Sequence, residues 1–257
     1  MKKLFTDFTK VVEIIPPTKN TEKFFKSIKI LKEVGVNTVS IVSNPIGKPK
    51  LPALYIAQYL IEQGFKVIVH YPLSGRSKVV VESDMLQAVS IGVNIILVLS
   101  GDSHGQRFQE GMCMVDAIKL VKSHNIVVGV AVDPNNINHE YLKAKVGAGA
   151  DYFQTQPIFT VDGALRFLKE ISRYELPVLM GIMIPKSQSH LIKLCQIPGI
   201  VIPLEYVGSF KKIKSEEIFI INALEQASKV INVVKKEVDG IYLSIPQSMF
   251  AHIMEIK

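Results

Sequence analysis

Short apolar runs alternate with amphipathic stretches along almost the whole chain, and few folds accept such an order. The apolar runs are predicted as eight strands over residues 11–15, 38–43, 66–72, 95–99, 126–134, 151–157, 177–185 and 240–245. Helices are predicted between them over 21–34, 51–63, 79–91, 110–123, 139–147, 161–172, 187–196 and 215–238. The segment 199–208 matches neither pattern, and the C-terminal end is predicted as helical. Strands separated by helices have to run parallel within one sheet.

The number of strand–helix units matches a closed (β/α)8 TIM barrel, since eight such units fit within the 257 residues of the chain. A doubly wound open sheet is the alternative α/β fold. That fold normally carries a glycine-rich turn after its first strand, where this sequence has Pro16 and Pro17. No linker or low-complexity tract divides the sequence, so we predict a single barrel domain over residues 1–257.

The formal net charge of +7 favours anionic partners, but the basic residues are spread over nearly every predicted helix. Without an arginine-rich arm or a basic–aromatic pattern, nucleic-acid binding is not predicted. No apolar run is long enough to span a bilayer and the N-terminus lacks a signal-peptide core, so we expect a cytoplasmic protein without a membrane partner. Cys113 and Cys195 lack CxxC spacing and are expected to be buried thiols, and the six histidines show no metal-binding spacing.

Polar residues gather at the predicted carboxyl ends of the strands, where the active sites of (β/α)8 barrels lie. In chain order they are Glu13, Ser43, Asn44, His70, Ser100, Asp102, Asp133, Gln154, Gln156, Lys186 and Ser244. Taken alone, Asp102 after a buried strand is typical of a turn. Glu13 stands inside an apolar strand, where an unpaired carboxylate costs on the order of several kcal/mol, so it should be paired, protonated or facing a wet pocket. Acids and amides that converge on one rim indicate a binding site.

Five motifs resemble those of a known family. They are V-E-I-I-P-P (12–17), H-Y-P (70–72), S-G-D (100–102), L-K-A-K-V-G-A-G-A-D-Y-F-Q-T-Q-P-I-F (142–159) and P-V-L-M-G-I-M-I-P (177–185). In this order they resemble the methylenetetrahydrofolate reductase family of flavin-bearing (β/α)8 barrels. The similarity extends in register over nearly the whole chain, and its most specific parts are the E-x-x-P-P opening and the block ending in T-Q.

The resemblance implies an oxidoreductase of one-carbon metabolism and methionine biosynthesis. In this family NAD(P)H reduces FAD, and the flavin passes a hydride to 5,10-methylenetetrahydrofolate, giving 5-methyltetrahydrofolate; another reductant could replace NAD(P)H here. By this resemblance Glu13 is the general acid, Asp102 lies near both flavin and pterin, and Gln156 binds the folate. A general acid needs a raised pKa, which desolvation beside Ile14 and Ile15 would give Glu13.

The same resemblance assigns a cofactor site. His70 and Lys145 match residues that contact FAD, and Lys145 can act as a point charge on its pyrophosphate. Ser100, Gly101, Asp102 and Asp133 occupy further cofactor positions.

Several cofactor positions depart from the family pattern. The family usually has arginine at the position of Ser100 and an aromatic residue at that of Asp133. A threonine that reaches the flavin is Val42 here, and an aromatic residue that stacks on nicotinamide or folate is Gln188. The pterin site is therefore better supported than the flavin and nicotinamide sites, and a partner subunit or a homo-oligomer could complete the site.

Two other functions stay open. A pterin-dependent methyltransferase is also a (β/α)8 barrel; it binds methyltetrahydrofolate with acids and amides and delivers the methyl group to a corrinoid protein. It needs no flavin, which suits the altered cofactor contacts, although the E-x-x-P-P and T-Q motifs fit it less well. The third possibility is a non-catalytic relative that binds folate or a partner protein.

Overall fold

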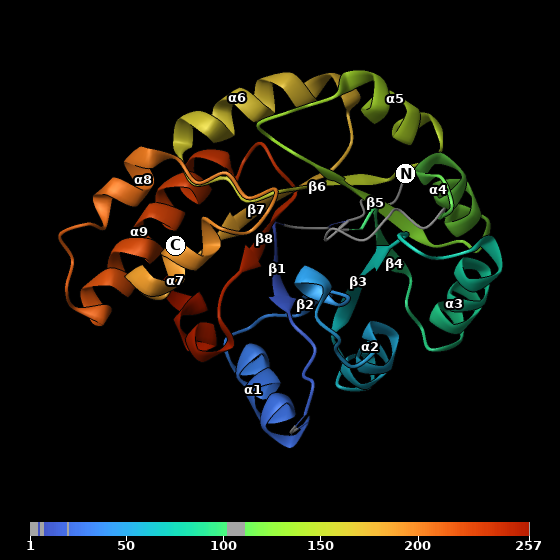
Figure 1. Cartoon of the computed structure of the whole chain (residues 1–257), viewed down its shortest axis with the longest axis horizontal. Helices are drawn as coiled ribbons and strands as arrows, with labels where there is room; N and C mark the ends of the chain where they lie inside the picture. The colour runs from blue at the N-terminus through green and yellow to red at the C-terminus, as the bar shows by residue number, and fades with distance from the viewer. Residues whose placement is uncertain (1–4, 6–7, 20, 102–110, 257) are drawn as a thin grey trace.

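The computed structural model describes residues 5, 8–19, 21–101 and 111–256; Asp102, one of the predicted site residues, lies outside them. Parallel strands close into a barrel in the order β1 to β8, which confirms the predicted (β/α)8 fold (Figure 1). The strands are β1 (Thr9–Ile14), β2 (Thr38–Ile41), β3 (Lys66–Pro72), β4 (Ile95–Leu99), β5 (Val127–Val132), β6 (Tyr152–Thr155), β7 (Val178–Met183) and β8 (Gly240–Ser244). β1 pairs with both β2 and β8, so the first and last strands close the barrel.

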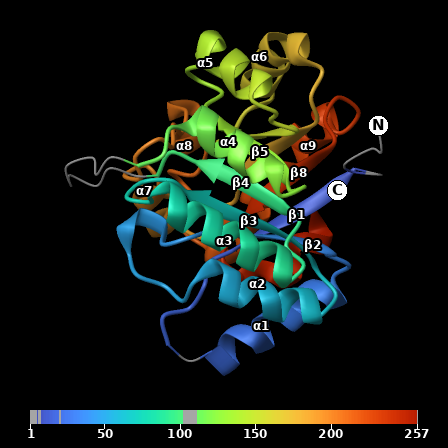
Figure 2. The ribbon, with the colours of Figure 1, turned by 90° about the vertical axis from the view of Figure 1, so that its right-hand side faces the viewer.

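The helices lie around the outside of the strands (Figures 1 and 2). They are α1 (Thr21–Glu33), α2 (Ala53–Glu62), α3 (Lys78–Ser90), α4 (Met114–Ser123), α5 (His139–Gly147), α6 (Val161–Ile171), α7 (Gln188–Leu194), α8 (Leu204–Ser209) and α9 (Glu216–Val234). Three 3-10 segments are η1 (Pro45–Gly47), η2 (Ser172–Tyr174) and η3 (Gln247–Glu255). The unassigned segment 199–208 thus contains most of the short helix α8.

Side-chain caps fix where several helices begin after the loops at the carboxyl end of the barrel. Helices α3, α5, α6, α7 and α9 each follow a residue whose side chain accepts a hydrogen bond from the backbone N–H three positions later. These caps are Ser77, Asn138, Thr160, Ser187 and Ser215. Such a contact satisfies a backbone donor that the first turn of a helix leaves without a partner.

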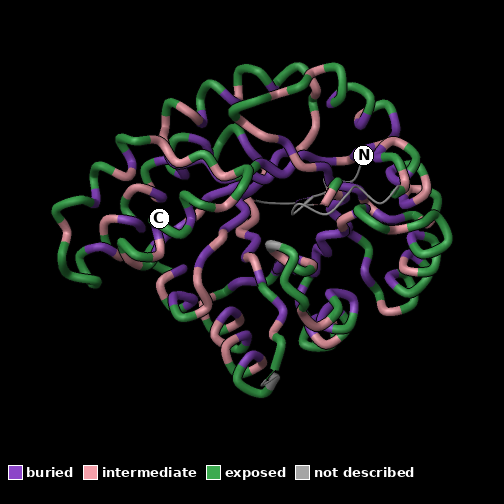
Figure 3. The backbone as a smooth tube through the Cα atoms, viewed as in Figure 1, coloured by how far each residue is buried: buried purple, intermediate pink, exposed green. Residues whose placement is uncertain are grey.

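The strands are largely buried (Figure 3), and two clusters of buried side chains lie on their two faces. Residues such as Val12, Ile41 and Val98 point outward and pack in the larger cluster beneath the helices. The smaller cluster fills the barrel and consists of Phe5, Val11, Ile68, Ile95, Leu97, Tyr152, Leu179 and Tyr242. The ring of Phe5 meets that of Tyr152 edge-on, with centroids 5.7 Å apart. Such an apolar filling is usual for a barrel of eight strands.

The barrel interior becomes polar toward the carboxyl ends of the strands. Successive side chains of a strand point to opposite faces, so residues two apart share the interior. Glu13 follows Val11 on β1 at this spacing, and His70 follows Ile68 on β3. Gln154 follows Tyr152 on β6 in the same way. The polar interior residues therefore form a layer that is closer to the carboxyl ends of the strands than the smaller apolar cluster.

The structure bears on two further features of the sequence, the length of its apolar helices and the surroundings of its two cysteines. Among the described residues, every helix is too short or too polar to cross a membrane. The expectation of buried thiols is wrong, because Cys113 and Cys195 are both exposed and unbridged. Cys113 directly precedes α4 and Cys195 directly follows α7, so each thiol lies at a helix end and is exposed to solvent.

Candidate active site

Glu13 lies inside the barrel at the carboxyl end of β1 and is held by two hydroxyl groups of the adjacent strand β8. Tyr242 donates a hydrogen bond to Oε2 of Glu13, and Oγ of Ser244 donates to Oε1 over 3.0 Å. The carboxyl group is therefore paired, as expected for an acid in an apolar strand. Burial raises the pKa of Glu13, and the two hydrogen bonds act in the opposite direction because they favour the ionised form.

A second buried polar pair lies in the same interior. The side-chain amide nitrogen of Gln154 lies 3.3 Å from Nε2 of His70, and both residues are buried. An amide nitrogen only donates, so Nε2 of His70 is the acceptor and the neutral ring carries its proton on Nδ1. Burial lowers the pKa of His70 to about 3, which keeps the ring uncharged at neutral pH. The His70 ring also lies 5.7 Å from the Tyr242 ring, which connects this pair to Glu13.

Polar atoms without partners surround these pairs. Within the described part of the chain, Oγ of Ser40, the hydroxyl of Tyr152 and Oε1 of Gln154 are buried and accept or donate no hydrogen bond. Ser40 is the register partner of Glu13 on β2. Each of these atoms is desolvated without a hydrogen bond to offset the cost, which is uncommon in a packed interior.

A cavity of about 270 Å³ lies at the ends of β4, β5 and β6, against the helices α4 and α5. It brings together four of the predicted site residues: Ser100, Asp133, Lys145 and Gln156. They come from four separate places in the sequence, so this convergence depends on the barrel. Gln156, the predicted folate ligand, is exposed directly after β6 and lines the mouth of the cavity.

Lys145 is the buried cation of this cavity. It lies on α5, its ammonium donates to the carbonyl oxygen of Ala131 over 3.2 Å, and it sits 4.4 Å from the centre of the Tyr141 ring. No carboxylate of the described residues forms an ion pair with it. Burial lowers the pKa of Lys145 to about 8. A buried ammonium that forms no ion pair with a described residue fits an anionic ligand, such as the pyrophosphate of a flavin dinucleotide.

Replacing Lys145 by Met is expected to stabilise the unliganded protein at pH 7 by about 1 kcal/mol, since it removes a desolvated charge. The folded pKa of about 8 lies below the ordinary lysine value of 10.5, so the unfolded chain binds more protons between these values. Stability of the wild type should therefore rise with pH over this window, and that of the Lys145→Met variant should rise less. Urea unfolding at pH 7.5 and pH 10 measures both effects. The exposed neighbour Lys143, replaced by Met, should keep the wild-type dependence.

The other predicted cofactor residues have mixed surroundings. The carboxylate of Asp133 accepts a hydrogen bond from the backbone of Asn135 over 2.9 Å, so it also shapes the turn after β5. Gly101 has φ +91, and an added Cβ would lie 2.7 Å from Cβ of Ser74; both features require glycine at this position. Asp102 follows it, outside the described residues, so its role stays a prediction. Lys186 is exposed.

Tyr242 is the site residue that sequence reasoning missed. It stands two positions before Ser244, which was recognised at the end of its strand. The period of two along a strand could have placed its side chain in the interior as well. Its contact with Glu13 joins residues 229 positions apart and arises from the pairing of β1 with β8.

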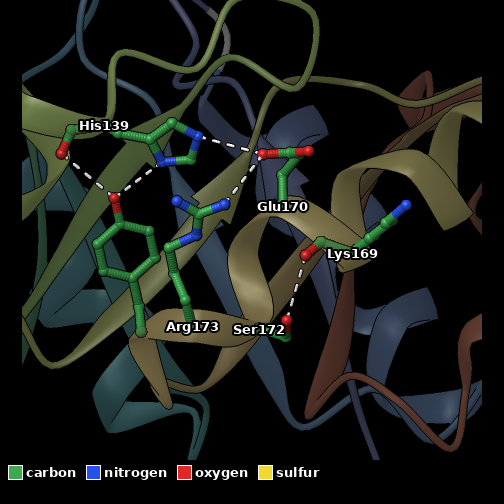
Figure 4. A network of polar contacts seen from close by, with 6 residues as sticks. His139, Lys169, Glu170, Ser172 and Arg173 are labelled. Carbon is green, nitrogen blue, oxygen red and sulfur yellow. Dashed lines mark hydrogen bonds and ion pairs between the residues drawn. The ribbon is translucent and has the colours of Figure 1, made fainter.

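A larger cavity, of about 640 Å³, lies outside the barrel between α5 and α6. A polar network borders it (Figure 4): Nδ1 of His139 lies 2.9 Å from the Tyr174 hydroxyl, and Nε2 lies 3.3 Å from Glu170. Arg173 donates to the same carboxylate over 3.4 Å. These contacts connect the start of α5 to the end of α6. None of the predicted site residues lines this cavity, so we place the candidate site at the strand ends.

Among the residues that the structure covers, no three His, Cys, Asp or Glu side chains gather closely enough to hold a metal ion.

Comparison with known sequences identifies relatives of this chain. The family model for methylenetetrahydrofolate reductase matches residues 5–244. The 5,10-methylenetetrahydrofolate reductase of Buchnera aphidicola subsp. Baizongia pistaciae is 33% identical over 123 residues, which cover 44% of this chain and 42% of that protein. Methylenetetrahydrofolate reductase 2 of Saccharomyces cerevisiae is 22% identical over 175 residues, 60% of this chain and 29% of the yeast protein. The chain thus spans less than half the length of these curated relatives.

Solved structures share the fold. An uncharacterised protein from Clostridium thermocellum that binds two copies of 5-methyl-5,6,7,8-tetrahydrofolic acid matches with a TM-score of 0.76 at 17% identity, over 98% of this chain and 97% of that chain. Yersinia pestis DHPS with a pterine–sulfa conjugate matches with a TM-score of 0.56 at 11% identity, over 98% and 94%. At such identities the likeness shows a common barrel fold.

Proposed function

The chain belongs to the methylenetetrahydrofolate reductase family, and from that membership we propose that it reduces 5,10-methylenetetrahydrofolate to 5-methyltetrahydrofolate. The observation that carries this proposal is the half-buried carboxyl group of Glu13 at the carboxyl end of the barrel, where desolvation raises its pKa. A general acid works best when its pKa lies near the operating pH, and burial moves that of Glu13 in this direction. Such a group is worth about 10²- to 10⁴-fold in rate.

Glu13 would act on the five-membered ring of the folate. It donates a proton to the ring nitrogen that leaves the methylene carbon, and the carbon–nitrogen bond breaks to give an iminium. A hydride then adds to the methylene carbon and completes the methyl group. The ionised Glu13 that remains accepts the hydrogen bonds of Tyr242 and Ser244. Gln156, exposed at the mouth, would bind the pterin edge with its amide, which offers a donor and an acceptor side by side.

A flavin bound here would supply the hydride. Lys145 would hold its anionic phosphates, and Ser100 and Asp133 border the same cavity, with Gly101 directly after Ser100 in the chain. Replacing Lys145 by Met is expected to weaken FAD binding about tenfold or more, because a charge-assisted contact of roughly 1.5–3 kcal/mol is lost. Fluorescence quenching of FAD measures the affinity, with Lys143→Met as the matched control. Equal affinity of all three proteins would remove Lys145 from the cofactor site.

Two observations favour a second candidate, a protein that binds methyltetrahydrofolate without a flavin, as a methyl carrier or methyltransferase. The Clostridium thermocellum protein, whose structure matches 98% of this chain, binds two copies of that compound. The carboxylate of Asp133 also lies in the cavity of Lys145, where it repels a pyrophosphate. In this reading Lys145 would contact a carboxylate of the second folate.

The absorption spectrum of the purified protein, followed by titration with FAD and 5-methyltetrahydrofolate, tests the reductase against this alternative. The reductase should bind one flavin and one folate, and NADH, NADPH or a low-potential reductant should bleach the flavin. Addition of 5,10-methylenetetrahydrofolate should then restore the oxidised spectrum. A protein that takes up no flavin and binds two folates would overturn the reductase proposal.

A further inference from the structure

Strand β8 presents two hydroxyl groups to Glu13 at different depths. Tyr242 is buried within the barrel, whereas Ser244 is half-buried at its mouth. Both lie on the interior face of β8, two positions apart, and each contacts a different oxygen of the carboxyl group. Glu13 is therefore held from below by a phenol and from above by a serine. Oε1 therefore lies on the side of Ser244, and Oε2 faces the phenol.

The phenol cannot readily move away from the carboxyl group. Its strand is paired on both sides: Tyr242 is the register partner of Val11 on β1 and of Gly181 on β7. The centroid of its ring lies 5.7 Å from the centroid of the His70 ring. Burial raises the pKa of Tyr242 well above its ordinary value, so the hydroxyl keeps its proton at neutral pH and remains a donor. A fixed donor favours the ionised form of the acceptor that it contacts.

Among the residues that the structure describes, the other polar side chains of the neighbouring strands carry no charge at neutral pH. His70 on β3 is neutral, Tyr152 on β6 is protonated, and Ser40 on β2 is uncharged. Lys10, on the same strand as Glu13, donates instead to the carbonyl of Ile256 over 3.0 Å. Among the described residues, the balance between burial and the two hydroxyl donors therefore sets the proton affinity of Glu13.

We propose that Tyr242 is a positioning residue for Glu13: its hydroxyl fixes the carboxyl group in the barrel and lowers the proton affinity that burial alone would give it. Without the phenol, Glu13 would hold its proton too tightly to release it to a substrate nitrogen. Ser244 plays the smaller part, because a half-buried hydroxyl exchanges its hydrogen bond with water. The consequence for turnover rests on the proposed function, but the proton affinity itself can be measured without any folate.

The experiment is an infrared titration of the unliganded full-length protein. The carbonyl band of protonated Glu13, identified by its loss in the Glu13→Gln variant, is followed as a function of pH. In Tyr242→Phe the midpoint should rise by about one pH unit or more, a tenfold change in proton affinity. In Ser244→Ala, the matched control, it should rise by less. If the reductase is active, the basic limb of its pH profile should move upward by the same amount in Tyr242→Phe.

A fluorinated tyrosine at position 242 keeps the ring and its packing. It therefore tests the same proposal if the phenylalanine variant does not fold. A more acidic phenol donates more strongly, and the midpoint should then move downward. Shifts in opposite directions distinguish proton control from a general loss of packing. An unchanged midpoint in a folded Tyr242→Phe protein, or an equal shift in Ser244→Ala, would overturn the proposal. Neither result depends on whether the protein binds flavin or folate.

Discussion

Replacing Glu13 by Gln is expected to lower turnover by about 10²- to 10⁴-fold, the usual contribution of a general acid, while folate affinity changes less than about tenfold. The amide has nearly the shape of the carboxyl group, but it carries no acidic proton that it could transfer to the substrate near neutral pH. It can also keep both local contacts, since hydroxyl groups accept as well as donate. Tyr242 can donate to the amide oxygen, and Ser244 can accept from the amide nitrogen.

Steady-state rates and equilibrium binding of 5-methyltetrahydrofolate separate the two effects. Lys186→Gln serves as the control, because this residue also follows a barrel strand but is exposed. It should leave turnover and binding unchanged. A Glu13→Gln protein with wild-type turnover would remove Glu13 from the mechanism. Equal losses in turnover and affinity would make Glu13 a binding residue instead.

The barrel could be predicted because the alternation of strands and helices is a local property repeated along the chain. Each strand is an apolar run of the right length, and each crossover restores the direction of the strand before it. The short helix α8 escaped prediction because six residues contain fewer than two turns and show no period. The prediction of buried cysteines was wrong for a similar reason: their exposure depends on where α4 begins and where α7 ends.

The candidate site was predicted only in part. Ser100, Asp133, Lys145 and Gln156 share one cavity, and the position of strand ends together with the family resemblance singled out each of them. The contact of Tyr242 with Glu13 requires the closure of β8 onto β1, and the contact of Gln154 with His70 requires the layering of β6 and β3 inside the barrel. Such contacts depend on how strands that are distant in the sequence are aligned, and a local pattern of residues does not predict that alignment.

Gly129 stands where the barrel interior leaves no room for a side chain. It lies on β5 opposite Tyr152 of β6. A Cβ at position 129 would lie 2.2 Å from Cζ of Tyr152 and 2.4 Å from its hydroxyl oxygen. The tyrosine ring is fully buried and has Phe5 edge-on against it, so it cannot swing into solvent. The glycine in this strand therefore marks a close approach rather than a turn.

Replacing Gly129 by Ala is expected to lower the free energy of unfolding by about 3 kcal/mol, the upper range for overpacking a core, and the melting temperature by roughly 6–12 °C. Urea and thermal unfolding measure the loss. Gly147→Ala is the control, because an added Cβ there meets no atom within 4 Å, and helix propensity should leave that variant as stable as the wild type or slightly more so. In a Tyr152→Leu background the Gly129→Ala change should cost little, since the ring that it displaces is gone. An equal cost in both backgrounds would show that the strain lies in the β5 backbone and not in the contact with Tyr152.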